Sequence, residues 1–166
     1  VSYSKVVVGP VPLSSDRRRI SSPFGRNVVE LDDFVKALKG KYLIAGNINI
    51  SEQLTEMGVE SIDLLKREEF SVLNTIATAE GTIQIAMEET QRTVHGTNVL
   101  IMGFGRIGKV LAKMLDGIGA KVYCEARKNE DISWIKAYGY NPIHLNDLND
   151  NLGKFDIIIN TIPFQL

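Results

Sequence analysis

The chain has 166 residues, of which 44% are hydrophobic, and its 19 basic and 20 acidic residues give a formal net charge of -1. This composition is typical of a globular chain and excludes collagen-like and disordered classes. The balanced charge provides no overall attraction to nucleic acid or to an anionic membrane surface. No apolar run reaches the length of a membrane span. Cys124 falls within an expected buried strand, so core packing in a reducing cytoplasm is its default role.

The first half of the chain alternates short apolar strands with helical stretches. Strands are expected at residues 5–8, 42–45 and 61–65, and helices at 31–39 and 51–57. This alternation predicts an α/β domain with a parallel sheet. The long loop at residues 9–30 contains Arg17, Arg18 and Arg19, with Arg26 nearby, which either gather an acidic substrate or form a solvated turn.

The next segment, residues 78–92, has the pattern of an amphipathic helix with Thr78 as a possible N-cap. We therefore expect three parts: residues 1–78 as part of a substrate-binding domain, 79–95 as a linker helix, and 96–166 as part of a cofactor-binding domain. His95, just before the second domain, is either a proton acceptor or a junction histidine bonded to the backbone. No metal site is predicted, and the sequence supports no nucleophilic triad.

A glycine loop at Gly103, Gly105 and Gly108 follows the apolar segment 99–102 and precedes an amphipathic helix. This is the spacing of a dinucleotide-binding βαβ unit: the first glycine allows the tight turn, the second the approach of the pyrophosphate, and the third close packing of helix and strand. The helix N-terminus then favours the phosphate anion. The context makes the motif specific.

The second strand of this unit is expected at residues 121–126, so that it ends at Ala126 and is followed by Arg127 and Lys128. Two cations at the adenosine ribose suit a 2′-phosphate, which predicts NADP(H) rather than NAD(H). In the alternative interpretation, the two cations lie in a solvated turn and Glu125 holds the ribose hydroxyls. A register shift of one residue would produce that arrangement.

The remaining elements complete a truncated Rossmann-type, doubly wound parallel sheet. Helices are expected at residues 131–138 and 146–152, and strands at 142–145 and 155–160. In the strand order 3-2-1-4, Thr161 and Pro163 follow the fourth strand at the edge that faces the cofactor. The sequence is expected to supply about four of the six strands of a complete dinucleotide-binding fold. We therefore expect the chain to be a fragment.

Several motifs occur together along the chain. They are GPVP at 9–12, NTIATAEG at 74–81, His95-Gly96, the glycine loop, Ala126-Arg127, NPIH at 141–144 and NTIP at 160–163. Their combination resembles the A-subunit family of dipicolinate synthase, from about residue 1 to residue 166. That resemblance implies a Rossmann domain preceded by a smaller flavodoxin-like α/β domain. The glycine loop is also similar to those of D-2-hydroxyacid dehydrogenases and S-adenosylhomocysteine hydrolase.

The resemblance implies oxidation of a dihydrodipicolinate-type precursor to dipicolinate, with NADP, in the cytoplasm of the mother cell of sporulating bacteria. It also implies a small dicarboxylate substrate, an oligomer, and a partner in the form of a flavoprotein-like B subunit. Family members usually have Pro where this chain has Ala77, which loosens the backbone there.

The site residues are predicted from the glycine loop, the strand ends and the resemblance together. Cofactor binding is expected at Gly103, Phe104, Gly105, Arg106, Ile107, Ala126, Arg127, Lys128, Thr161 and Pro163. By resemblance, Asn74, Thr75, Thr78 and Glu80 line the substrate cleft, although Thr78 could simply cap a helix. No catalytic residue is named, because orientation against the nicotinamide and aromatisation of the product could suffice. A D-2-hydroxyacid dehydrogenase-like oxidoreductase and a non-catalytic NADP(H)-sensing domain remain alternatives.

Overall fold

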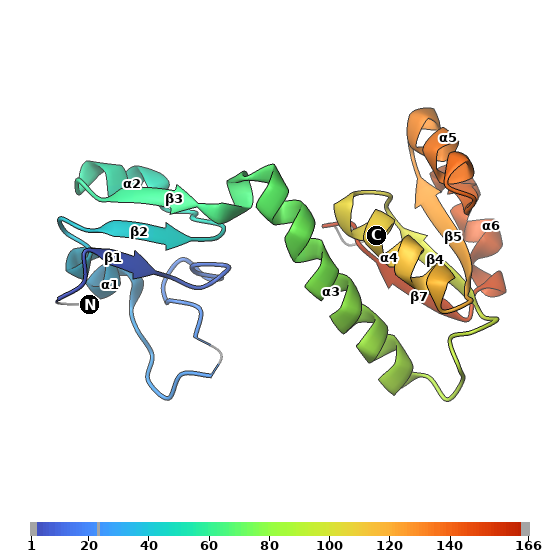
Figure 1. Cartoon of the computed structure of the whole chain (residues 1–166), viewed down its shortest axis with the longest axis horizontal. Coiled ribbons are helices and arrows are strands. Elements are labelled where there is room, and N and C mark those ends of the chain that lie inside the picture. The colour runs from blue at the N-terminus through green and yellow to red at the C-terminus, as the bar shows by residue number, and fades with distance from the viewer. Residues whose placement is uncertain (1–2, 23, 164–166) are drawn as a thin grey trace. The chain divides into compact units, whose positions relative to one another are not determined.

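The computed structural model describes residues 3–22 and 24–163. The chain forms two compact units, residues 1–71 and 72–166, and each is described here by itself. Both are α/β units built on parallel strands (Figure 1), as the alternation of elements predicts. Among the described residues, none of the helices is both long enough and apolar enough to cross a membrane.

The first unit contains a three-stranded parallel sheet in the order β1-β2-β3. Its elements are β1 (Val6–Val8), α1 (Leu31–Ala37), β2 (Tyr42–Ala45), α2 (Ser51–Glu56), β3 (Glu60–Asp63) and the short 3-10 helix η1 (Leu64–Lys66). Leu43 and Ala45 of β2 are fully buried against Val35 and Leu54 of the helices. The expected strands and helices of this region are confirmed to within about two residues at each end.

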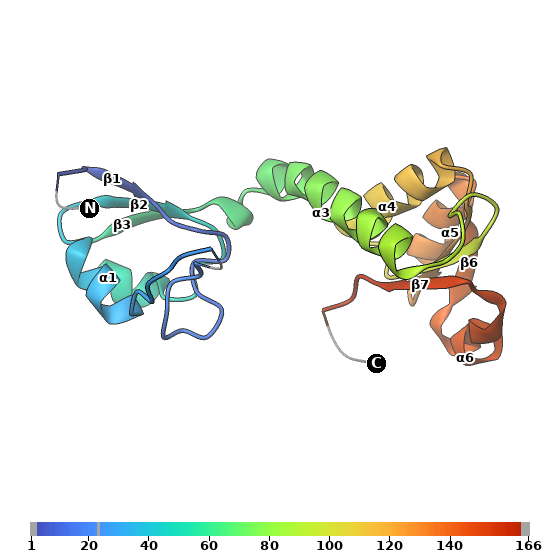
Figure 2. The ribbon, with the colours of Figure 1, turned by 90° about the horizontal axis from the view of Figure 1, so that it is seen from below.

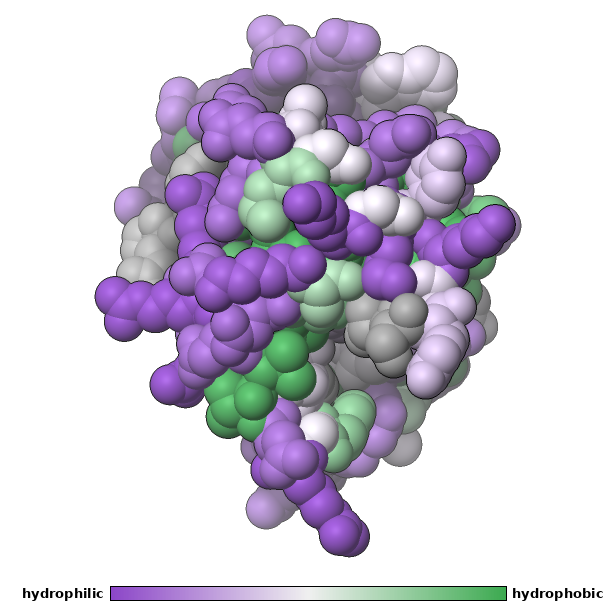
Figure 3. Space-filling model, turned by 90° about the vertical axis from the view of Figure 1, so that its left-hand side faces the viewer, coloured by the Kyte–Doolittle hydropathy of each residue, from purple (hydrophilic) through white to green (hydrophobic). Residues whose placement is uncertain are grey.

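Most charged side chains are exposed at the surface, and the apolar residues of the strands are mainly buried. Figure 3 shows a face on which hydrophilic side chains predominate and hydrophobic ones form only small patches. Burial of the apolar strand residues and exposure of the charged ones follow from the hydrophobic effect, which is the main force in folding.

The second unit begins within α3 (Glu68–Glu89) and holds the four-stranded parallel sheet β6-β5-β4-β7. Its strands are β4 (Asn98–Met102), β5 (Lys121–Ala126), β6 (Asn141–His144) and β7 (Ile157–Asn160); its other elements are α4 (Arg106–Gly117), α5 (Asn129–Ala137), α6 (Leu148–Asn151), and 3-10 helices η2 (Leu145–Asp147) and η3 (Leu152–Lys154). The predicted strand order 3-2-1-4 is confirmed.

Strand β4 is buried on both faces, as expected of a central strand in a parallel sheet. Val99 and Ile101 pack with Leu111 of α4, whereas Leu100 and Met102 face the opposite layer with Leu148 of α6. Figure 2 shows α4 and α6 on opposite sides of the sheet. Because the register aligns the ends of β4, β5, β6 and β7, their carboxyl ends share one edge.

Helix α3 begins ten residues before the predicted start, so the interpretation of Thr78 as an N-cap is wrong. Instead of capping, the hydroxyls of Thr75, Thr78 and Thr82 donate within the helix, to carbonyls three or four residues earlier. Ala77, where the resembling family usually has Pro, keeps its backbone N–H and lets the helix continue.

Candidate cofactor-binding site

The glycine loop between β4 and α4 has the tight geometry that its spacing predicts. Gly103 has a φ of +93°, a left-handed conformation that favours glycine. A Cβ on Gly108 would lie 2.2 Å from the carbonyl oxygen of Gly103. Glycine at these two positions is therefore required by the chain's own packing.

Gly105 is different, because no described part of the chain requires a glycine there. Its φ of -81° is open to any residue, and an added Cβ would meet no described atom within 4 Å. Gly105 is the N-cap of α4, and none of the described side chains caps this helix. The N-terminus of such a twelve-residue helix favours an anion. The space kept open at Gly105 therefore fits the pyrophosphate of a dinucleotide.

A cavity of about 260 Å³ adjoins this loop at the carboxyl edge of the sheet. It is lined by Gly103, Phe104, Gly105, Glu125, Ala126, Arg127, Lys128, Asp131 and Ile162. Six of the predicted cofactor residues thus lie together in one cavity. Sequence reasoning missed Asp131 and Ile162, whose proximity arises from folding rather than from the glycine motif.

The end of β5 places small, acidic and basic groups around the cavity. Ala126, the last residue of the strand, offers no carboxylate to a ribose, whereas the side chains of Arg127 and Lys128 are exposed. Such cations can bind a phosphate. The predicted strand bounds are confirmed.

Glu125 is a buried acid beside this site, with only 1% of its surface exposed. Its Oε1 has no hydrogen-bond partner among the described residues. Burial raises the pKa of Glu125, while a hydrogen bond from the Gly103 backbone and the charge of Arg127 oppose that rise. In the register of the sheet, Glu125 lies beside Met102 and Ile143. Its side chain is on the face of the sheet opposite to that of Ala126.

Thr161 follows β7 at the same edge, and its hydroxyl is engaged within the fold. Thr161 Oγ1 donates to the carbonyl oxygen of Met102 at 2.8 Å. This bond ties the end of β7 to the glycine loop. Pro163 is exposed after the strand, and Arg106 and Ile107 occupy the first turn of α4, with Ile107 packed against the core. Their contact with a cofactor stays a prediction.

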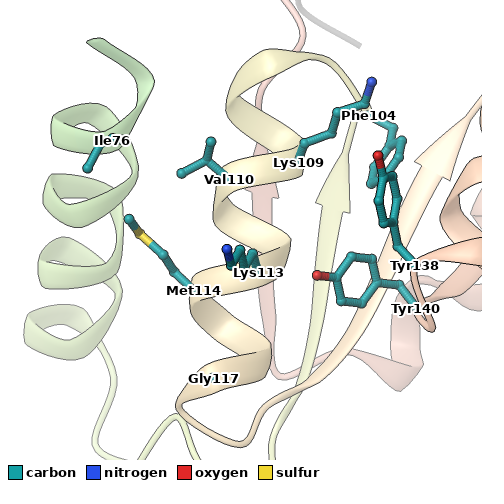
Figure 4. Close-up of a pocket in the computed structure, with 9 residues that line it drawn as sticks. All are labelled: Ile76, Phe104, Lys109, Val110, Lys113, Met114, Gly117, Tyr138 and Tyr140. Atoms are coloured by element: carbon teal, nitrogen blue, oxygen red, sulfur yellow. The ribbon is translucent and has the colours of Figure 1, made fainter. Parts of the chain in front are cut away.

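A larger cavity, of about 630 Å³, lies beside α4 and is mainly apolar. Figure 4 shows Val110 and Met114 of α4 with Ile76 of α3 along it, and Tyr138 and Tyr140 from another side. The ring of Phe104 packs 6.0 Å from that of Tyr138, so the ring belongs to this aromatic cluster. Although it is larger, this cavity lacks the turn at Gly103 and Gly105 that fits a phosphate, whereas the smaller cavity is lined by both glycines.

The predicted substrate residues all lie in α3. Asn74, Thr78 and Glu80 are exposed, whereas Thr75 is buried and its hydroxyl donates to the carbonyl of Val72 at 2.6 Å. Their role toward a substrate stays a prediction.

His95 precedes β4, at the amino edge of the sheet. A Cβ on Gly119 would lie 2.4 Å from the His95 ring, so the two residues are closely packed. The glycine loop lies at the other end of β4. This placement supports the interpretation of His95 as a junction residue.

The arginine run lies in the loop of the first unit and is exposed. Asp16 accepts hydrogen bonds from the backbone N–H groups of Arg18 and Arg19, which lower its pKa. Arg19 also pairs with Glu30 at 3.6 Å. These contacts favour the interpretation of a solvated turn.

Comparison with known proteins agrees with this geometry. Residues 65–165 match the family described as D-isomer specific 2-hydroxyacid dehydrogenase, NAD binding domain. The A subunit of dipicolinate synthase from Bacillus subtilis (strain 168) is 36% identical over 105 residues, which cover 63% of this chain and 35% of that protein.

Solved structures extend the likeness over nearly the whole chain. The A subunit of dipicolinate synthase from Bacillus halodurans matches with a TM-score of 0.83 and 26% identity, over 98% of this chain and 57% of that one. The A polypeptide of dipicolinate synthase from Bacillus subtilis matches with a TM-score of 0.75 and 28% identity, over 96% of this chain and 55% of that one. A transhydrogenase from Sinorhizobium meliloti, with a TM-score of 0.69 and 16% identity over 98% and 52%, shares the fold alone. The chain thus spans about a third of the curated relative and just over half of the solved ones.

Proposed function

The chain belongs to the family of D-isomer specific 2-hydroxyacid dehydrogenase NAD-binding domains, and on that premise we propose that it serves an NADP(H)-dependent oxidoreductase. Membership makes a nicotinamide dinucleotide the cofactor. The observation that carries the choice of NADP is the end of β5, where Ala126 replaces a ribose-binding carboxylate and Arg127 and Lys128 line the same cavity.

Each part of the site has a separate task in this proposal. The N-terminus of α4 and the space at Gly105 receive the pyrophosphate, and Arg127 grips the 2′-phosphate. Thr161 holds the end of β7 against the glycine loop through Met102. When bound, the nicotinamide supplies a hydride acceptor or donor, and the chain contributes binding, orientation and exclusion of water.

We further propose that the protein is of the dipicolinate synthase A type and oxidises a dihydrodipicolinate-type precursor to dipicolinate. Support comes from the curated relative and from the two solved dipicolinate synthase structures. Action in the cytoplasm of a sporulating mother cell, an oligomeric state and a partner of the B type belong to the same proposal. Asn74, Thr75, Thr78 and Glu80 are its proposed substrate residues.

The first test compares the binding of NADPH and NADH by calorimetry, using the protein at its full natural length. We expect a preference for NADPH that falls about 10- to 150-fold in Arg127→Ala, because a charge-assisted hydrogen bond contributes about 1.5–3 kcal/mol. Lys121→Ala is the matched control, since it removes an exposed cation at the amino end of the same strand. Equal affinity of the unmodified protein for both cofactors would refute the choice of NADP.

The family match also favours a second candidate, an oxidoreductase acting on simple 2-hydroxy acids. Assays of the full-length protein, with its partner present, separate the two. NADPH formation with 2-hydroxy acids, and not with the dihydropyridine substrate, would favour the second candidate. Cofactor binding without turnover of either substrate would instead indicate a sensing domain.

A further inference from the structure

His144, the last residue of β6, links two neighbouring strand ends at the cofactor edge. Its Nε2 lies 3.1 Å from the carbonyl oxygen of Arg127, and its Nδ1 accepts the backbone N–H of Asn146 at 3.2 Å. In register, His144 stands beside Ala126. The ring therefore connects the segment that follows β6 with the segment that follows β5.

These two bonds determine the protonation of the ring. A backbone N–H can only donate, so Nδ1 must be the unprotonated nitrogen. A carbonyl can only accept, so Nε2 must carry the hydrogen that goes to Arg127. The neutral Nε2–H form satisfies both partners at once, as is common where a histidine orients a neighbouring group.

The bond to Arg127 is made to its main chain, which leaves the guanidinium free to point elsewhere. Arg127 is exposed and lies at the start of the turn between β5 and α5. Such turns have few backbone hydrogen bonds of their own, so a side chain that holds one carbonyl restricts the local backbone. A restricted backbone limits the directions in which the Arg127 side chain can extend.

We propose that His144 is a positioning residue that sets the cofactor specificity of this site, by holding the main chain of Arg127 so that its guanidinium meets the 2′-phosphate. The inference rests on the proposed preference for NADP(H). The role given to His144 is to hold the main chain of Arg127. This role is separate from phosphate binding by the glycine loop and by the side chains of Arg127 and Lys128. Glu125, which lines the same cavity and interacts electrostatically with Arg127, is a competing partner for an unrestrained guanidinium.

The test uses two small probes that differ only in the 2′-phosphate, 2′,5′-ADP and 5′-AMP, titrated into the full-length protein. The unmodified protein is expected to prefer 2′,5′-ADP. In His144→Phe, which keeps a ring but has no donor, this preference falls about fivefold while 5′-AMP affinity is retained. In His144→Gln, whose amide nitrogen can still donate to Arg127, the preference returns.

The outcomes separate this inference from the proposed function. If His144→Phe keeps the preference while Arg127→Ala loses it, the positioning role is refuted and the NADP site stands. If the unmodified protein shows no preference between the probes, the proposed NADP site fails and this inference fails with it. Loss of affinity for both probes in equal measure would show a merely structural role and would also refute the inference.

A second measurement needs no variant. The ¹⁵N chemical shifts of the His144 ring report which nitrogen carries the hydrogen, and we expect the Nε2–H form in the unliganded protein. A ring protonated at Nδ1 alone would contradict the two bonds on which the inference depends.

Discussion

Replacement of single glycines in the loop between β4 and α4 separates folding from cofactor binding. Gly108→Ala would place a Cβ 2.2 Å from the Gly103 carbonyl oxygen, about 1 Å closer than carbon and oxygen normally approach. The contact is with backbone, which cannot rotate away as a flexible side chain would. Overpacking of this kind costs about 1–3 kcal/mol, so we expect the free energy of unfolding to fall by roughly that amount.

Gly105→Ala is the counterpart, because its Cβ meets no described atom of the chain within 4 Å. Alanine is a poorer N-cap than glycine but restricts the unfolded chain, so stability should stay within about 1 kcal/mol of the unmodified protein. The new methyl group would occupy the space proposed for the pyrophosphate. A steric cost of about 1–3 kcal/mol corresponds to a roughly 5- to 150-fold weaker affinity for NADPH.

The assay is urea unfolding followed by circular dichroism, together with calorimetric titration of NADPH. Gly117→Ala in the last turn of α4 is the control, since its Cβ also meets nothing described within 4 Å and it is remote from the loop. It should be neutral or slightly stabilising and should bind NADPH normally. Unchanged NADPH affinity in Gly105→Ala would refute the pyrophosphate site, and normal stability of Gly108→Ala would refute the packing argument.

Two further predictions concern the carboxyl edge of the same sheet. For Glu125, burial raises the folded-state pKa, so the folded protein binds more protons than the unfolded one and stability falls as pH rises above the ordinary Glu value of 4.5. Glu125→Gln should therefore be about 1 kcal/mol more stable than the unmodified protein in urea unfolding at pH 8 and equal to it near pH 4; equal stability at both pH values would argue against a buried charge. For Thr161, the Met102 carbonyl also accepts the Thr161 backbone N–H, so Thr161→Val should lose only about 0.5–1.5 kcal/mol and Thr161→Ser almost nothing. A Val variant as stable as the unmodified protein, together with a destabilised Ser variant, would show that the methyl group, and not the hydroxyl, stabilises this edge.

Local pattern in the sequence was enough for much of this fold. The apolar segment of β4, the glycines of the loop and the helix after it follow rules that act over a few residues, so the bounds of β5 and the strand order of the second sheet could be predicted. Six cofactor-site residues could be nominated for the same reason, because the motif and the end of the next strand always meet at one edge.

Other features could not be predicted, either because two local arrangements compete or because the contacts join residues far apart in the chain. Thr75 and Thr78 lie inside a longer α3 than the sequence predicts. Their hydroxyls donate to helix carbonyls, which a threonine can do as readily as it can cap a helix. The ring of Phe104 packs near that of Tyr138. Thr161 donates to Met102, and His144 donates to Arg127. The partners in each contact are far apart in the chain, so no local sequence pattern predicts them. The sequence by itself therefore determined the order of elements and the glycine loop through short-range sterics. Only the tertiary structure decided which polar side chains are free for a ligand, because that depends on which partners the fold brings within hydrogen-bond distance.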